Sequence, residues 1–201
     1  TRYIVATDGA CKGNPGPTGW AWVGEDGQWA AGAIPVGTNN IGELMGLLKA
    51  IEDHADVAHL VVQADSKYAI DTFSSWMDAH RRRGWKTSTG APTKNRDLLE
   101  QLIVARDARR ERGLPDVVLE HVRGHRGHVL NEWADERAVR GAARVRAERA
   151  HPADEDRHLR DRQREQVRPV DQELGRRGRE PAPGRRNGRH RRRSRRDGHR
   201  S

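Results

Sequence analysis

The stretch YIVATDGACKGNPGPTGWAWVGEDGQWAAGAIPV, residues 3–36, contains three short apolar segments separated by turn residues. The segments cover residues 3–7, 20–23 and 29–36, and Gly, Pro or Asp-Gly lies at each break. Short β-prone runs with such breaks are typical of consecutive strands joined by turns. The stretch therefore predicts a three-stranded antiparallel meander at the start of the fold.

After the meander, helical and strand patterns alternate along the chain. We expect Asn39-Asn40 to cap a helix, because apolar residues follow at helical spacing, namely Leu44, Leu47, Leu48 and Ile51. The later elements expected are a buried strand over 59–64, a helix over about 66–79, a helix from Pro92 that carries Leu98, Leu99, Leu102 and Ile103, a strand over 117–122 and a helix over 131–145. The order β-β-β-α-β-α-α-β-α predicts an α/β fold, a five-stranded mixed sheet with helices on its faces.

The net charge of +9 lies entirely in the last part of the 201-residue chain. Residues 1–145 hold 19 Lys and Arg against 19 Asp and Glu, whereas residues 146–201 hold 19 Arg, no Lys and 10 acids. The last segment also has few apolar residues and no sustained period, which is typical of disorder. We therefore predict a folded domain over 1–145 and a disordered, Arg-rich tail over 146–201.

Three interpretations of the tail are open. It is a tether for nucleic acid, an extension without a specific role, or the out-of-frame translation of a GC-rich coding sequence. The third is favoured by the absence of Lys beside 19 Arg.

The cysteine content and the lack of a signal or membrane-spanning pattern bear on the cellular location. Cys11 is the only cysteine, which excludes an intrachain disulfide and a four-cysteine zinc site. No secretory signal and no apolar run of membrane-spanning length is visible. We expect a cytoplasmic protein that is a monomer and has no membrane partner.

Four carboxylates are expected at the ends of elements. Asp8 is expected to end the first strand, Glu43 to lie in the first turn of the first helix, Asp65 to end the fourth strand and Asp135 to lie near the start of the last helix. Strand ends form the ligand crevice of an open α/β sheet. Adjacent carboxylates repel unless a cation lies between them, and oxygen ligands alone favour magnesium or manganese over zinc. A zinc site of His121, His125 and His128 is disfavoured, because no cysteine assists it.

Four motifs together resemble bacterial type I ribonuclease H. In order they are TDGACKGNPGP at residues 7–17, TNNIGEL at 38–44, DSKY at 65–68, and GHRGH at 124–128 followed by NEWAD at 131–135. The resemblance covers roughly residues 2–145. It implies a ribonuclease H-like fold and cleavage of the RNA strand of an RNA/DNA hybrid, with two Mg²⁺ ions or Mn²⁺ as a substitute. The products would carry 5′-phosphate and 3′-hydroxyl ends.

The same resemblance assigns roles to residues. Asp8 would bridge both metal ions, Glu43 and Asp65 would complete one metal site, and Asp135 would hold the other. His125, on a Gly-flanked loop, would assist proton transfer or product release. An imidazole suits that role because it titrates near neutral pH.

The resemblance also implies contacts to the hybrid. Asn14 and Thr38 would bind a DNA phosphate, and the other expected contacts near them are Cys11, Asn39 and Asn40. Residues 76–87, here called the basic protrusion, would hold the DNA strand through Trp76, Arg81, Arg82, Arg83, Trp85 and Lys86. The absence of a nearby acidic partner in the sequence favours a binding role for these cations. Val36, Gly37 and Lys67 depart from the family pattern, which affects DNA binding rather than the reaction.

Two alternatives compete with a hybrid-specific ribonuclease. A DNase of the same fold class, such as an integrase- or resolvase-like enzyme, would lack the basic protrusion and the GHRGH loop. A protein that binds nucleic acid through the tail without cutting would not need the four carboxylates.

Overall fold

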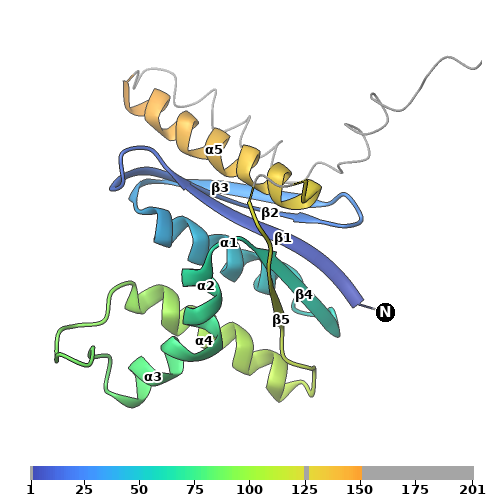
Figure 1. Cartoon of the computed structure of the whole chain (residues 1–201), viewed down its shortest axis with the longest axis vertical. Coiled ribbons are helices and arrows are strands. Elements are labelled where there is room, and N and C mark those ends of the chain that lie inside the picture. The colour runs from blue at the N-terminus through green and yellow to red at the C-terminus, as the bar shows by residue number, and fades with distance from the viewer. Residues whose placement is uncertain (1, 125–126, 151–201) are drawn as a thin grey trace, which may run out of the picture.

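A single mixed sheet forms the centre of the computed structural model, which describes residues 2–124 and 127–150 (Figure 1). The strand order is β3-β2-β1-β4-β5. The strands are β1 (Arg2–Cys11), β2 (Gly16–Gly24), β3 (Trp29–Gly37), β4 (His59–Ala64) and β5 (Val118–His121). β1, β2 and β3 pair antiparallel, whereas β1–β4 and β4–β5 are parallel. The expected α/β fold with a five-stranded mixed sheet is confirmed.

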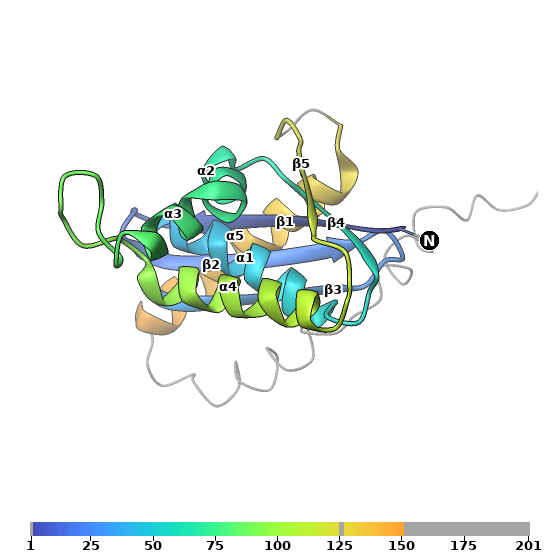
Figure 2. The same ribbon diagram turned by 90° about the horizontal axis from the view of Figure 1, so that it is seen from below.

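Helices cover both faces of the sheet. The helices are α1 (Asn39–Asp53), α2 (Lys67–Asp71), the π-helix η1 (Thr72–Trp76), α3 (Met77–Arg82), α4 (Arg96–Glu111) and α5 (Val129–Ala150). α1 packs on β1 and β2, and α4 packs on α1, while α5 packs alone on the opposite face (Figures 1 and 2). None of the helices in the described part of the chain is long and apolar enough to cross a membrane.

The main core lies between the sheet and α1. Its buried side chains include Val5 and Val62 from the sheet, Leu44 and Leu47 from α1, and Leu102 from α4. The stripe expected for the first helix is therefore confirmed, and it faces the sheet.

α5 instead approaches the sheet through small residues. A Cβ on Gly19 would lie 2.0 Å from the Ala138 carbonyl oxygen, and one on Gly141 would lie 3.0 Å from that of Gly32. Helix and sheet backbones therefore touch directly on this face.

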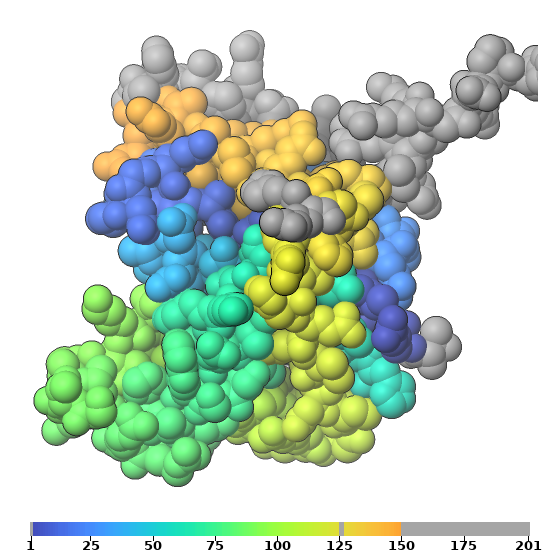
Figure 3. Space-filling view, in the orientation of Figure 1, coloured from blue at the N-terminus to red at the C-terminus, as the bar shows by residue number. Residues whose placement is uncertain are grey.

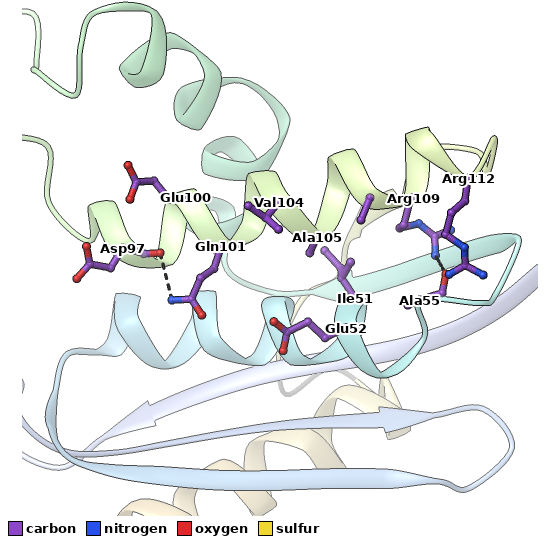
Figure 4. A pocket seen from close by; sticks show the side chains of 11 residues that line it. Ile51, Glu52, Ala55, Asp97, Glu100, Gln101, Val104, Ala105, Arg109 and Arg112 are labelled. Carbon is purple, nitrogen blue, oxygen red and sulfur yellow. Dashed lines mark hydrogen bonds between the residues drawn. The ribbon is translucent and has the colours of Figure 1, made fainter.

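An apolar hollow of about 470 Å³ runs along the outer side of α1 and α4 (Figure 4). Ile51 from α1 and Val104 and Ala105 from α4 line it, and Arg112 Nη1 closes one end by donating to the Ala55 carbonyl at 3.1 Å. None of the four expected acids lines this hollow. It is therefore a seam between two helices, separate from the carboxylates.

Several boundaries differ from those expected. Thr38, not Asn39-Asn40, caps α1: its Oγ1 accepts from the Ile41 N–H at 3.2 Å. The helix expected over 66–79 continues to Arg82 and includes the π-helix η1. The sequence did not predict η1, because one π-helical turn does not visibly change the spacing of apolar residues.

The helix expected from Pro92 begins four residues later. Pro92 pairs with Lys86 in an isolated β-bridge, and Asn95, with a left-handed backbone (φ 58°), starts α4 instead. Asn tolerates that conformation better than most residues.

The last helix is longer than the expected 131–145. It starts at Val129 and runs to Ala150. The division into a domain over 1–145 and a tail over 146–201 stays a prediction, and the expected disorder of the tail concerns residues that lie almost wholly outside the described chain.

Candidate active site

Asp8 and Asp65 are adjacent because two parallel strands end their pairing together. The β1–β4 register ends at Thr7 opposite Ala64, so the next residue on each chain is a carboxylate. Asp8 was expected to end β1, and this expectation was wrong. β1 continues to Cys11, because its antiparallel pairing with β2 extends past the end of β4. Asp8 thus lies inside β1, one residue past the end of its parallel pairing with β4.

Glu43 reaches Asp8 because α1 crosses β1 at a glycine. A Cβ on Gly9 would lie 2.2 Å from both the Glu43 nitrogen and the Gly42 carbonyl carbon. The same crossing brings Gly46 over the backbone of Asp8. Glu43 lies in the second turn of α1 rather than the first, because the helix begins at Asn39.

The three carboxylates form one compact cluster. One oxygen from each of Asp8, Glu43 and Asp65 lies within 4.8 Å of the other two. Asp8 is 5% exposed, and its Oδ1 accepts from the Gly9 N–H at 2.7 Å. Glu43 Oε2 is buried without a hydrogen-bond partner among the described residues. Glu43 Oε2 is therefore an acceptor that a cation could satisfy.

Burial and repulsion raise the pKa values of two of these acids in the metal-free protein. Burial, then the charge of Asp65, raises the pKa of Asp8 to about 7. Burial, then the charge of Asp8, raises the pKa of Glu43 to about 9. A bound cation would remove this repulsion, so the cluster is a candidate cation site.

Asp135 lies near the cluster but outside its closest set. It is half-buried on α5, and its charge contributes to the raised pKa values of Asp8 and Glu43. Its oxygens are not among those within 4.8 Å. The structure therefore brings all four predicted acids to one crevice, in an arrangement of three and one. We call these four residues the acidic crevice.

Two residues lie against Asp65 in contacts that the sequence did not predict. A Cβ on Gly124 would lie 2.4 Å from Asp65 Oδ2, so only glycine fits there without a shift. The ring of His121 lies 3.2 Å, Nε2 to oxygen, from the Asp65 carbonyl. Gly124 was visible only as part of the GHRGH motif. His125 lies outside the described residues.

The residues expected to bind phosphate meet at the start of α1. Asn14 Oδ1 accepts from the Asn39 N–H at 3.0 Å, which joins the β1–β2 turn to the helix. Thr38 is half-buried, and Asn39 and Asn40 are exposed. The Cys11 thiol donates to the carbonyl of Gly37, the last residue of β3, at 3.5 Å, so it faces the backbone just before α1.

The basic protrusion extends from one end of the molecule (Figures 1 and 2). Arg81, Arg82, Arg83 and Lys86 are exposed, and Trp76 is 45% exposed. Trp85 is instead packed against the core, with Arg96 5.2 Å above its ring.

One expectation about the protrusion was wrong. Arg81 does have an acidic partner, since its Nη1 lies 3.7 Å from Asp107 Oδ2. α4 brings that carboxylate from a distant part of the sequence. Arg82 and Arg83 form no ion pair within the described chain.

Comparison with known proteins identifies relatives. The RNase H family model matches residues 1–143. Ribonuclease H of Rhodospirillum rubrum is 40% identical over 149 residues, which cover 72% of this chain and 86% of that protein. Ribonuclease H of Alcanivorax borkumensis is 42% identical over 143 residues, 70% of this chain and 91% of that protein.

A solved structure gives the same assignment. LC9-RNase H1, a type 1 RNase H with the type 2 active-site motif, is 28% identical and superposes with a TM-score of 0.58, covering 71% of this chain and 74% of that one. Together with the acidic crevice, the family match and these relatives show that the chain belongs to the RNase H family and is an RNase H nuclease.

Proposed function

We propose that this nuclease hydrolyses the RNA strand of RNA/DNA hybrids by two-metal-ion catalysis, giving 5′-phosphate and 3′-hydroxyl ends. The observation that carries the proposal is the cluster of Asp8, Glu43 and Asp65, whose oxygens lie within 4.8 Å of one another. The expectations of a monomer and of a cytoplasmic location belong to the same proposal.

The residues of the crevice fit Mg²⁺. Every donor is a carboxylate oxygen, the ligand type that Mg²⁺ and Mn²⁺ prefer. Glu43 Oε2 is buried without a hydrogen-bond partner in the described chain, and a cation would satisfy it. Bound there, divalent ions supply a water of lowered pKa and stabilise negative charge on the phosphate.

Each acid has a distinct proposed role. Asp8, whose Oδ1 accepts from the Gly9 N–H, would serve as a ligand to both ions. Glu43 and Asp65 would complete one site, and Asp135 from α5 would hold the other. His125, which follows Gly124 in the sequence, would assist proton transfer or product release.

The hybrid would lie across the turn and the protrusion. Asn14 and Thr38 would bind a DNA phosphate, with Cys11, Asn39 and Asn40 beside them. Amides and hydroxyls fix the backbone without reading sequence. Trp76, Arg81, Arg82, Arg83, Trp85 and Lys86 would hold the DNA strand further along. Arg81 also shares its charge with Asp107, so Arg82 and Arg83 contribute more.

The test compares Asp65→Asn with a matched control, Asp56→Asn, whose side chain is 89% exposed. We expect the wild-type chain and Asp56→Asn to cut a labelled RNA/DNA duplex with Mg²⁺ and not with EDTA. Asp65→Asn should bind the duplex and leave it uncut. Mass spectrometry of the fragments should show the 5′-phosphate and 3′-hydroxyl ends.

Other outcomes would contradict the proposal. Undiminished cutting by Asp65→Asn would overturn the metal assignment. Cutting of duplex DNA in preference to the hybrid would favour a DNase. Binding without any cutting by the wild-type chain would favour a protein that only binds nucleic acid.

A further inference from the structure

A second group of cations lies at the far end of the β1–β2 hairpin from the acidic crevice. Lys12, Arg146 and Arg149 line a hollow of about 350 Å³, together with Gly13 and Pro17 of the turn. We call Lys12, Arg146 and Arg149 the hairpin cluster. Neither the proposed catalytic residues nor the basic protrusion includes any of them.

The backbone contacts of α5 hold this cluster together. Gly19 on β2 lies directly against the α5 backbone at Ala138 and Ala142, so the helix cannot lift away or slide without losing that fit. The hairpin is closed by the Lys12 N–H, which donates to the Pro17 carbonyl at 2.8 Å. Two rigid elements thus place Arg146 and Arg149 beside Lys12.

In the part of the chain that the structure describes, no carboxylate forms an ion pair with the hairpin cluster. Within residues 2–124 and 127–150, neither Lys12 nor Arg146 forms an ion pair, and Arg149 Nη1 donates only to the neutral Pro35 carbonyl, at 3.3 Å. Arg140, two turns earlier on α5, instead pairs with Glu136 at 2.6 Å. Converging unpaired cations repel one another unless an anion lies between them.

The place of the cluster indicates which anion it would bind. Lys12 and Gly13 directly precede Asn14, which contacts the start of α1. The protrusion and the C-terminal end of α5 lie on the same side of the molecule, with α5 above the sheet and the protrusion below it in the view of Figure 1 (Figures 1 and 2). In the space-filling view, the blue hairpin lies between the orange end of α5 and the green protrusion (Figure 3).

We propose that the hairpin cluster binds the phosphodiester backbone of the hybrid beyond the contact made by Asn14 and Thr38. This inference rests on the proposed function, since it extends the same nucleic-acid surface. Lys and Arg bind phosphates and release counterions whatever the base sequence. The sequence adds 17 further arginines after Ala150, so the Arg-rich segment joins the domain at this cluster.

The test uses the full 201-residue chain and two double variants that each remove two positive charges. Arg146→Ala with Arg149→Ala alters the cluster. Lys49→Ala with Arg140→Ala is the control, because each of these cations is paired with a carboxylate on its own helix. Affinity for a fluorescent RNA/DNA hybrid is measured in EDTA at several salt concentrations, so that no cutting is required. Thermal unfolding checks that both variants are folded.

We expect the cluster variant to bind roughly ten- to a hundredfold more weakly at low salt, with a salt slope smaller by about 2. Lys12→Glu, in the separate turn, should weaken binding in the same direction. The loss should grow with hybrid length, because a longer duplex reaches the cluster. The control should bind like the wild type.

Equal affinities and salt slopes for the cluster variant and the wild type would overturn the inference. An equal loss in the control would also overturn it, because the effect would then be one of total charge. Failure of the proposed function gives a different result: no cutting with Mg²⁺, whatever the affinities in EDTA.

Discussion

The acidic crevice and the basic protrusion lie in the same domain but are built differently. The crevice is assembled by backbone contacts: two parallel strands end together, and α1 crosses β1 at Gly9. The protrusion consists of a short helix and a loop. Its firmest anchor to α4 is one side-chain pair, Arg106 to Asp78, with distances of 2.6 and 3.0 Å.

The difference shows what each region must do. Metal ligands must be held within a fraction of an ångström, which only closely packed backbone provides. Cations that bind a phosphate chain tolerate movement, because the attraction is long-ranged and nonspecific. Changes in the crevice should therefore act through packing and abolish activity, whereas changes in the protrusion should have graded effects.

The largest expected effect compares one glycine from each region. Gly9→Ala places a Cβ 2.2 Å from the Glu43 backbone, so we expect a stability loss of roughly 3 kcal/mol or more and no cutting. Gly84→Ala, in the basic protrusion, meets nothing within 4 Å and costs only its positive φ of 66°, about 1–2 kcal/mol. Urea denaturation and hybrid cleavage measure both. Similar losses of stability and of cleavage in the two variants would show that the crevice does not depend on backbone packing more than the protrusion does.

The second prediction concerns the burial of Glu43 and its repulsion by the other acids of the crevice. The folded pKa of Glu43 is raised from 4.5 to about 9, so the metal-free folded state binds more protons than the unfolded state in that range. The stability of the metal-free wild type should therefore fall as pH rises through this window. Glu43→Gln lacks this titration, and its melting temperature should exceed that of the wild type increasingly from about pH 5 to about pH 9.

Two further measurements check the cause of this effect. Mg²⁺ should reduce the difference in melting temperature between Glu43→Gln and the wild type, because it stabilises the wild type. The exposed control Glu52→Gln, whose carboxylate pairs with Lys49, should show no such trend. A difference in melting temperature that does not change with pH would exclude the raised pKa of Glu43, from burial and repulsion, as the cause.

The smallest expected effect tests the anchor of the protrusion. Arg106 is 7% exposed, and Arg106→Ala leaves Asp78 without its partner. Because Asp78 is partly exposed, we expect a stability loss of about 1–3 kcal/mol rather than the full cost of a buried pair. Hybrid affinity should fall with it, while cutting at saturating hybrid is kept.

Arg140→Ala is the matched control for the anchor. It breaks an exposed pair within α5 and should cost no more than about 0.5 kcal/mol. A loss in this control equal to that of Arg106→Ala would mean that the anchor is no stronger than a surface pair.

Much of the fold could be predicted from the sequence because its signals are local. Breaks at Gly and Pro predicted the meander, and the period of Leu44, Leu47 and Ile51 predicted α1 and its buried face. The errors lie where a distant contact overrides a local signal. Pro92 is a good first residue of a helix, yet its pairing with Lys86 delays α4. Arg81 pairs with Asp107 of α4 rather than with Asp78, its nearest acid along the chain, which pairs with Arg106.

The sequence by itself determined the order of the elements and the positions of the four acids along them. Only the tertiary structure decided which groups meet. Asp8 joins Asp65 through the strand order, Glu43 joins them through the crossing at Gly9, and Lys12 meets Arg146 because α5 packs on small residues. Periodicity is a property of neighbours along the chain. The distance between remote residues depends on strand order and on how closely two backbones approach, and no local pattern encodes either.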